Sequence, residues 1–91
     1  MSVPKRTAGV LSEVVDDIAL VLSPDGQRLI TLNRTGAVIW EAVDGHRDIA
    51  GLADELAMRV EIERSQLEND VATFVAALEQ TGLVVFSDAS D

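Results

Sequence analysis

The chain has 91 residues, of which 47% are apolar, and seven basic side chains face sixteen acidic ones for a formal net charge of −9. This length fits one domain with a modest core, and without cysteine the chain has neither disulfides nor thiolate metal ligands. The acidic surface disfavours nucleic acid and anionic membranes as partners, and because no apolar stretch is long enough for a membrane span or a signal peptide we expect a cytosolic protein.

The first third of the chain is predicted to form three strands, at residues 10–15, 18–22 and 28–32. Asp16-Asp17 is a plausible turn between the first two runs. Pro24-Asp25-Gly26 is a strong turn signal before the third run, because proline presets φ and glycine tolerates positive φ. Short turns between consecutive strands predict an antiparallel meander.

Three helices are predicted after Asn33, which is a preferred N-cap residue. The first covers residues 35–43 and the second follows Asp48, with apolar residues at helical spacing up to residue 60. The third covers residues 65–80, where Ser65 and Glu68 match a capping box, and Gly82 is placed to end it. Residues 83–86 are apolar and expected to pack or pair. We therefore expect one domain at residues 1–86 and a flexible tail at residues 87–91.

The predicted fold class is α+β, with a three-stranded antiparallel sheet followed by three helices. A sheet of three strands has one face for the helices to cover and two open edges. An edge that is left accessible can bind an extended peptide as a further strand, through main-chain hydrogen bonds. The residues alone thus indicate a small acidic domain with peptide-binding edges.

An ordered set of short motifs between residues 29 and 84 resembles the PqqD family. The motifs are Leu32-Asn33-Arg34-Thr35-Gly36-Ala37, Ile39-Trp40, Asp44-Gly45, Arg47-Asp48-Ile49, Leu52-Ala53-Asp54-Glu55-Leu56, the run from Leu67 to Leu78, and Thr81-Gly82-Leu83-Val84. The resemblance implies a winged-helix-like fold. It also implies a protein without catalytic activity or cofactor, which binds the leader of a ribosomally made precursor peptide. Such a protein delivers the peptide to a radical SAM enzyme, a leader peptidase or a cyclase.

The family's binding mode places the leader as an added strand beside the third strand, in a groove shared with the third helix. On the strand the resemblance points to Arg28, Leu29, Ile30, Thr31 and Leu32, acting through their backbone. On the helix it points to an apolar stripe and its shoulder, formed by Leu67, Asp70, Val71, Phe74, Ala77 and Leu78. Acidic residues around the groove, at Glu63, Asp70 and Asp25, are expected to attract basic leader residues.

Other interpretations of the same residues remain open. Any one residue of the helical stripe also suits the core, and Trp40 is expected in the core. His46 stands alone without a second metal ligand, so we expect it to be exposed and no metal site to form.

Other functions are weighed against the same sequence. A winged helix suggests DNA binding, but between residues 61 and 80 Arg64 is the single basic residue among five acidic ones. The sequence has no Gly-rich phosphate loop, no nucleophile elbow and no histidine pair, so we do not expect an enzyme. A generic protein-interaction module and a homodimer built on an open edge also fit.

Overall fold

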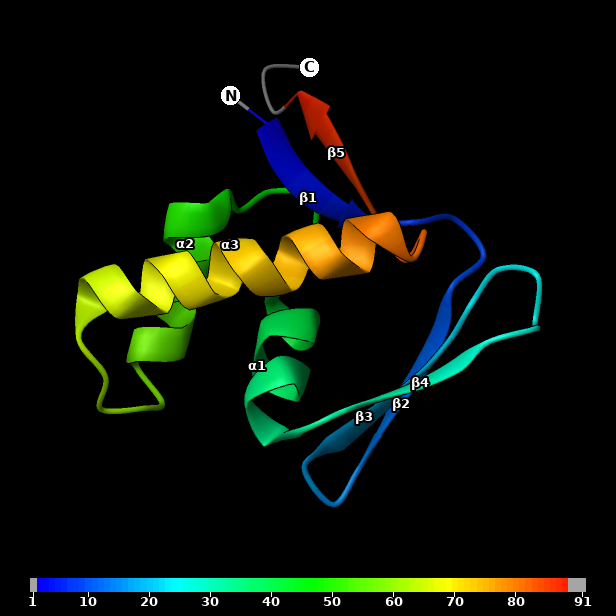
Figure 1. Cartoon of the computed structure of the whole chain (residues 1–91), viewed down its shortest axis with the longest axis horizontal. Coiled ribbons are helices and arrows are strands. Elements are labelled where there is room, and N and C mark those ends of the chain that lie inside the picture. The colour runs from blue at the N-terminus through cyan, green and yellow to red at the C-terminus, as the bar shows by residue number, and fades with distance from the viewer. Residues whose placement is uncertain (1, 89–91) are drawn as a thin grey trace.

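The computed structural model describes residues 2–88 of the chain, which form two small sheets and three helices (Figure 1). Strands β2 (Leu11–Val15), β3 (Ile18–Leu22) and β4 (Leu29–Leu32) form an antiparallel sheet in the order β2-β3-β4. Helices α1 (Arg34–Ala42), α2 (Ile49–Ala57) and α3 (Arg64–Gln80) follow in the chain. The three-stranded sheet and three helices that the sequence predicts are thus present, in the predicted order.

The two turns of the meander explain its register. Asp16 and Asp17 both have positive φ, 51° and 68°, as the two-residue type I′ hairpin requires. In the next turn the Asp25 carboxylate accepts hydrogen bonds from the Ser23 hydroxyl and from the Gln27 backbone N–H. These turns align the strands so that Ala19 and Val21, both fully buried, face the helices.

Side chains that precede the first two helices cap them as predicted. The Asn33 side chain accepts a hydrogen bond from Gly36 N at 2.8 Å, and Asp48 does the same for Gly51 N. The second helix ends at Ala57, three residues before the predicted limit.

The third helix begins differently from the prediction. It starts at Arg64, one residue earlier than expected, with Glu63 at its N-cap and no side-chain cap bond. The Ser65 hydroxyl donates to the Glu63 carboxylate, and Glu68 pairs with Arg64 at 3.1 Å. The predicted capping box is therefore wrong, because both of its members are engaged elsewhere.

A second, two-stranded sheet was not predicted in full. β1 (Ser2–Arg6) pairs antiparallel with β5 (Val84–Asp88), so that Ser2 lies opposite Asp88. The sequence predicted that residues 83–86 would pack or pair, but it did not show β1. β5 also extends two residues past the expected domain limit at residue 86, while residues 89–91 of the expected tail lie outside the described residues. Figure 1 shows this pair beyond α3, away from the three-stranded sheet.

The core lies between the helices and the inner face of the sheet. Trp40 is completely buried, as expected, together with Leu52 and Leu56 of α2 and Val71 and Val75 of α3. Among residues 2–88 no helix is long and apolar enough to cross a membrane.

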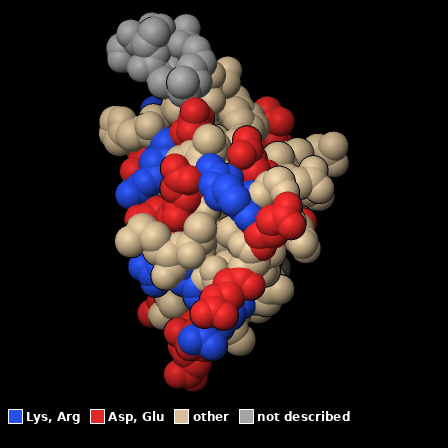
Figure 2. All heavy atoms as spheres, turned by 90° about the vertical axis from the view of Figure 1, so that its left-hand side faces the viewer, with Lys and Arg blue, Asp and Glu red and all other residues tan. Residues whose placement is uncertain are grey.

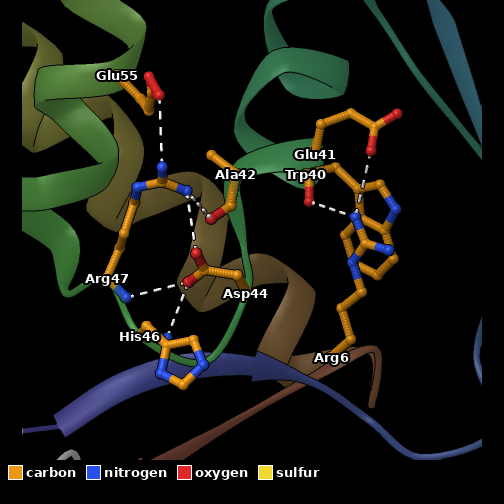
Figure 3. Close-up of polar contacts among 8 residues, drawn as sticks. All are labelled: Arg6, Trp40, Glu41, Ala42, Asp44, His46, Arg47 and Glu55. Atoms are coloured by element: carbon orange, nitrogen blue, oxygen red, sulfur yellow. Dashed lines mark hydrogen bonds and ion pairs between the residues drawn. The ribbon is translucent and has the colours of Figure 1, made fainter.

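Two arginines fasten the helical layer through hydrogen bonds to backbone carbonyls (Figure 3). Arg47 donates to Ala42 O at 3.2 Å and pairs with Asp44 at 3.1 Å, which secures the corner between α1 and α2. Arg6 of β1 donates to Trp40 O at 2.8 Å, and its guanidinium lies 4.6 Å from the centre of the Trp40 ring. β1 is therefore tied to the centre of the core.

Candidate peptide-binding site

The outer edge of β4 is unpaired among the described residues, because β4 has β3 as its neighbour on one side and none on the other. Ser23 N donates to Arg28 O at 2.9 Å, so the main-chain groups of Arg28 face β3. Hydrogen-bonding direction alternates along an antiparallel strand. The main-chain N–H and C=O groups of Ile30 and Leu32 therefore also face β3. The N–H and C=O groups of Leu29 and Thr31 face the open edge.

A hollow of about 330 Å³ lies where the end of β4, the start of α1 and the middle of α3 meet. Its lining combines apolar side chains with hydroxyl, amide and carboxylate groups. The lining residues are Thr31, Leu32, Asn33, Thr35, Gly36, Ile39, Asp70 and Phe74. A strand added to β4 would pass this hollow, because the last two residues of β4, Thr31 and Leu32, line the hollow.

Gly36 determines where the Phe74 ring rests. A Cβ atom built on Gly36 would lie 3.0 Å from Phe74 Cζ and 3.1 Å from Cε1, closer than about nine in ten real Cβ contacts. The ring therefore lies directly against the α1 backbone and is only partly buried. One side of the aromatic ring is left to line the hollow.

The structure brings together four of the residues that the sequence assigned to the site. Thr31 and Leu32 of β4 and Asp70 and Phe74 of α3 all line the same hollow. Asp70 and Phe74 are one helical turn apart and so lie on one side of α3.

The other predicted residues lie elsewhere. Leu67, Val71 and Leu78 are 1%, 0% and 4% exposed and belong to the core. Ala77 is exposed on α3, and Arg28 and Leu29 are exposed at the start of β4, outside the lining of the hollow. Ile30 packs partly buried against the core.

Four lining residues were missed by the assignment from sequence: Asn33, Thr35, Gly36 and Ile39. The first three belong to the motif Leu32–Ala37 at the junction of β4 and α1, and Ile39 belongs to the next motif, Ile39-Trp40, within α1. These motifs were the available signal, but capping by Asn33 and packing of α1 in the core accounted for them without a binding role.

Acidic groups differ in their distance from the hollow. Asp70 lines it directly, whereas Asp25 lies in the turn before β4 and Glu63 at the start of α3. A hydrogen bond from the Ser23 hydroxyl, with a second from Gln27 N, holds the pKa of Asp25 below its ordinary value of 3.8. Asp25 thus serves its turn as an ionised acceptor.

The basic residues of the helical layer are largely neutralised by neighbours. Figure 2 shows the side where α2 and the start of α3 lie, with acidic and basic side chains interspersed. Arg64, the basic residue of α3, lies 2.8 Å from Asp54 and 3.1 Å from Glu68. A phosphate backbone would have to displace these carboxylates before it could use Arg64.

A larger hollow, of about 740 Å³, lies between the β2–β3 turn, α1 and α2. Its charges are balanced, with three arginines and three carboxylates in its lining: Arg34, Arg47, Arg59, Asp17, Glu41 and Glu55. Arg47 pairs with Glu55 at 3.5 Å, and Arg34 lies 3.9 Å from Asp17. Two of the three arginines thus pair with carboxylates of the lining, and the lining as a whole carries no formal net charge to select a ligand.

The chain was compared with curated proteins and with solved structures. No curated protein matches it. The structure of TbiB1 in complex with the TbiA(beta) leader peptide matches with a TM-score of 0.82 at 22% identity, over 92% of this chain and 99% of that one. Lasso peptide synthetase B1 complexed with the leader peptide matches with a TM-score of 0.78 at 23% identity, over 90% of this chain and 96% of that one. These likenesses confirm the fold.

A family model extends the likeness to the sequence. The model for coenzyme PQQ synthesis protein D (PqqD) matches residues 19–84, which include all of β3 but its first residue, β4, all three helices and the whole hollow beside Phe74. Since this match spans well over half of the sequence, the chain belongs to the PqqD family.

Proposed function

We propose that this protein is a non-catalytic peptide chaperone, which binds the leader of a ribosomally synthesised precursor peptide as an added strand on β4. The observation that carries the proposal is the unpaired β4 edge beside the hollow lined by Phe74 and Asp70. Membership in the PqqD family supports it. So do the two similar structures, which are complexes with leader peptides.

In this proposal main-chain groups of β4 align the peptide backbone, and side chains around the hollow select the peptide sequence. Leu29 and Thr31 present their N–H and C=O groups to the peptide backbone, which is how strand addition gains affinity with little dependence on sequence. Alternate peptide side chains then turn towards the helices. An aliphatic or aromatic anchor that enters the hollow against Phe74 contributes about 1.5–3 kcal/mol, and a basic residue beside it pairs with Asp70.

The peptide would then be handed to a separate enzyme: a radical SAM enzyme, a leader peptidase or a cyclase. The chaperone itself does no chemistry in this scheme and needs no cofactor. Its acidic charge supports a basic or neutral peptide as partner rather than DNA. A homodimer formed by edge-to-edge pairing on β4 would occupy the same main-chain groups, and so would compete with the peptide.

Isothermal titration calorimetry tests the proposal with the leader segment of any short precursor that is encoded beside this chain. A scrambled peptide and a DNA duplex serve as controls. We expect micromolar or tighter binding of the leader alone. A folded protein that does not bind the leader would contradict the proposal. Salt-dependent binding of the DNA duplex would instead support the alternative function, DNA binding by a winged helix.

Proline substitution at the strand edge tests the binding mode. Thr31→Pro removes an N–H that faces the open edge of β4, so it should weaken leader binding while β3 keeps its bonds to β4. Ser12→Pro is the matched control, because Ser12 lies on the opposite edge strand and by the same alternation directs its N–H outward. If the two folded variants bind the leader equally well, the peptide does not add to β4.

A further inference from the structure

Three leucines stand in register across the sheet on the face away from the helices. Leu11 of β2 lies opposite Leu22 of β3, which lies opposite Leu29 of β4. Side chains alternate along each strand, and the buried Val21 next to Leu22 faces the core. The three leucines, here called the leucine row, therefore lie on the outer face.

The outer face is more apolar than a solvent-facing sheet usually is. Leu11 and Leu29 are each 65% exposed, and Val15 and Ile18 are 47% and 40% exposed on the same face. All three helices lie on the other side of the sheet (Figure 1). Strands with one solvated face normally alternate apolar with polar residues, so an aliphatic outer face in a chain of net charge −9 indicates a binding partner.

The leucine row ends at the open edge. Leu29 is its last member, and the N–H and C=O groups of the same residue face the position of an added strand. A strand paired there lies about 4.8 Å from β4, and the residue beside Leu29 directs its side chain to the outer face. That side chain would extend the row by one position.

We propose that the bound leader completes the leucine row with an aliphatic side chain, so that the peptide is read on both faces of the sheet. This inference rests on the proposed function. Leu32, at the hollow on the inner face, and Leu29, on the outer face, are three positions apart and on opposite faces. The leader is therefore predicted to carry two apolar residues with two residues between them. If the peptide runs antiparallel to β4, the first enters the hollow and the second packs on Leu29; a parallel peptide reverses this order.

A second copy of the chain is a poorer occupant of this face. Two copies would each bring a net charge of −9. A stable interface also buries about 800 Å² on each partner, more than a few half-exposed aliphatic side chains supply. The peptide needs only the edge of the face, which is where the most exposed leucine of β4 stands.

Calorimetry with the leader peptide tests the inference on two matched variants. Leu29→Thr keeps a residue suited to a strand and removes the apolar contact, so leader binding should weaken about three- to tenfold. Leu11→Thr changes the same residue type, at the same exposure and in the same row, but two strands away from the peptide. It should bind the leader within twofold of wild type. Circular dichroism and a thermal melt confirm that both variants fold.

An alanine scan of the leader provides the second measurement. We expect the two most costly positions to be three apart, and the cost at one of them to disappear in the Leu29→Thr background. If Leu29→Thr binds the leader as tightly as wild type while Thr31→Pro binds it more weakly, strand addition is supported. The proposed contact of the leader with the outer face is then overturned. Equal loss in both leucine variants also overturns it, as does a concentration-dependent dimer in sedimentation that both variants abolish. If wild type binds no leader, the proposed function itself fails.

Discussion

The Phe74 ring lies directly on the backbone of Gly36, with ring Cζ 3.0 Å from where a Cβ of residue 36 would be. This contact joins α3 to the first turn of α1 at the point where the hollow begins. A methyl group there would press on the far end of the phenylalanine side chain and would also lie 3.3 Å from Oδ1 of Asn33, the N-cap acceptor. The ring would therefore tilt into the hollow and reduce the space for a peptide side chain.

We expect Gly36→Ala to weaken leader binding by about tenfold or more while the domain stays folded. Overpacking costs about 1–3 kcal/mol, but alanine in a helix is favoured over glycine by about 1 kcal/mol, so the net loss of stability should be small. Calorimetry and a urea melt measure the two quantities separately. Gly51→Ala is the matched control, because Gly51 occupies the same position after its N-cap in α2, away from the hollow. Equal affinities for both variants would contradict the role of the Gly36–Phe74 contact.

Asp70→Asn should weaken binding of a leader that carries a basic residue next to its anchor, by about two- to fivefold, and should reduce the dependence of affinity on salt. An exposed charge pair contributes up to about 1 kcal/mol and is screened by salt. Titrations at low and high salt measure both effects. Glu79→Gln removes the same charge from α3 at a position that does not line the hollow, so its affinity should match that of wild type. Equal effects of both substitutions would mean that net charge alone attracts the peptide.

Asp44→Ala should destabilise the domain by about 1 kcal/mol at neutral pH, the usual net contribution of a hydrogen bond to stability. Asp44 accepts hydrogen bonds from the backbone N–H groups of His46 and Arg47. The bond from His46 N is the main reason that the pKa of Asp44 lies below its ordinary value of 3.8.

The pH dependence of this effect has a definite sign. Because the pKa is lower in the folded protein, the stabilisation is complete well above pH 3.8 and is lost as the pH falls through the folded value. Urea melts at neutral pH and near pH 3 should therefore show the difference between wild type and Asp44→Ala shrinking in acid. A difference that is constant across this range would contradict an ionised Asp44 as the acceptor.

Arg6→Ala should destabilise the domain by about 1–3 kcal/mol, since it removes the cation–π contact with Trp40 and the hydrogen bond to Trp40 O. Trp40 is the single tryptophan of the chain, so its fluorescence in a urea melt reports this site directly. Lys5→Ala, on the exposed side of β1, is the control and should have little effect. If Arg6→Lys is as stable as wild type, the planar guanidinium is not what matters.

The parts of the fold that depend on local chemistry could be predicted from sequence. Turn residues define the meander, and Asn33 and Asp48 cap their helices as expected. β1 could not be predicted, because its partner β5 lies more than 75 residues away and the pairing is determined by tertiary packing. The start of α3 was misplaced because Ser65 bonds to Glu63, a competing local acceptor.

For the site, periodicity predicted the apolar stripe of α3 but not how much of it α1 covers. Val71 faces the core fully, whereas Phe74, at the edge of the stripe on the side of Asp70, is left partly open. That division depends on the missing side chain of Gly36, and a helical repeat carries no information about the neighbouring helix.

The antiparallel pairing of Ser2 with Asp88 brings the first and last described residues of the chain side by side. Residues opposite each other in such a ladder have Cα atoms about 5 Å apart, a separation that neighbouring residues of a surface loop in another protein can match. The whole domain could therefore be inserted into such a loop without stretching its host. The β4 edge, which Figure 1 places away from this pair, would stay open. An enzyme that carries the inserted domain would hold its peptide substrate at a high local concentration. The same leader-binding domain could thus be inserted into different enzymes.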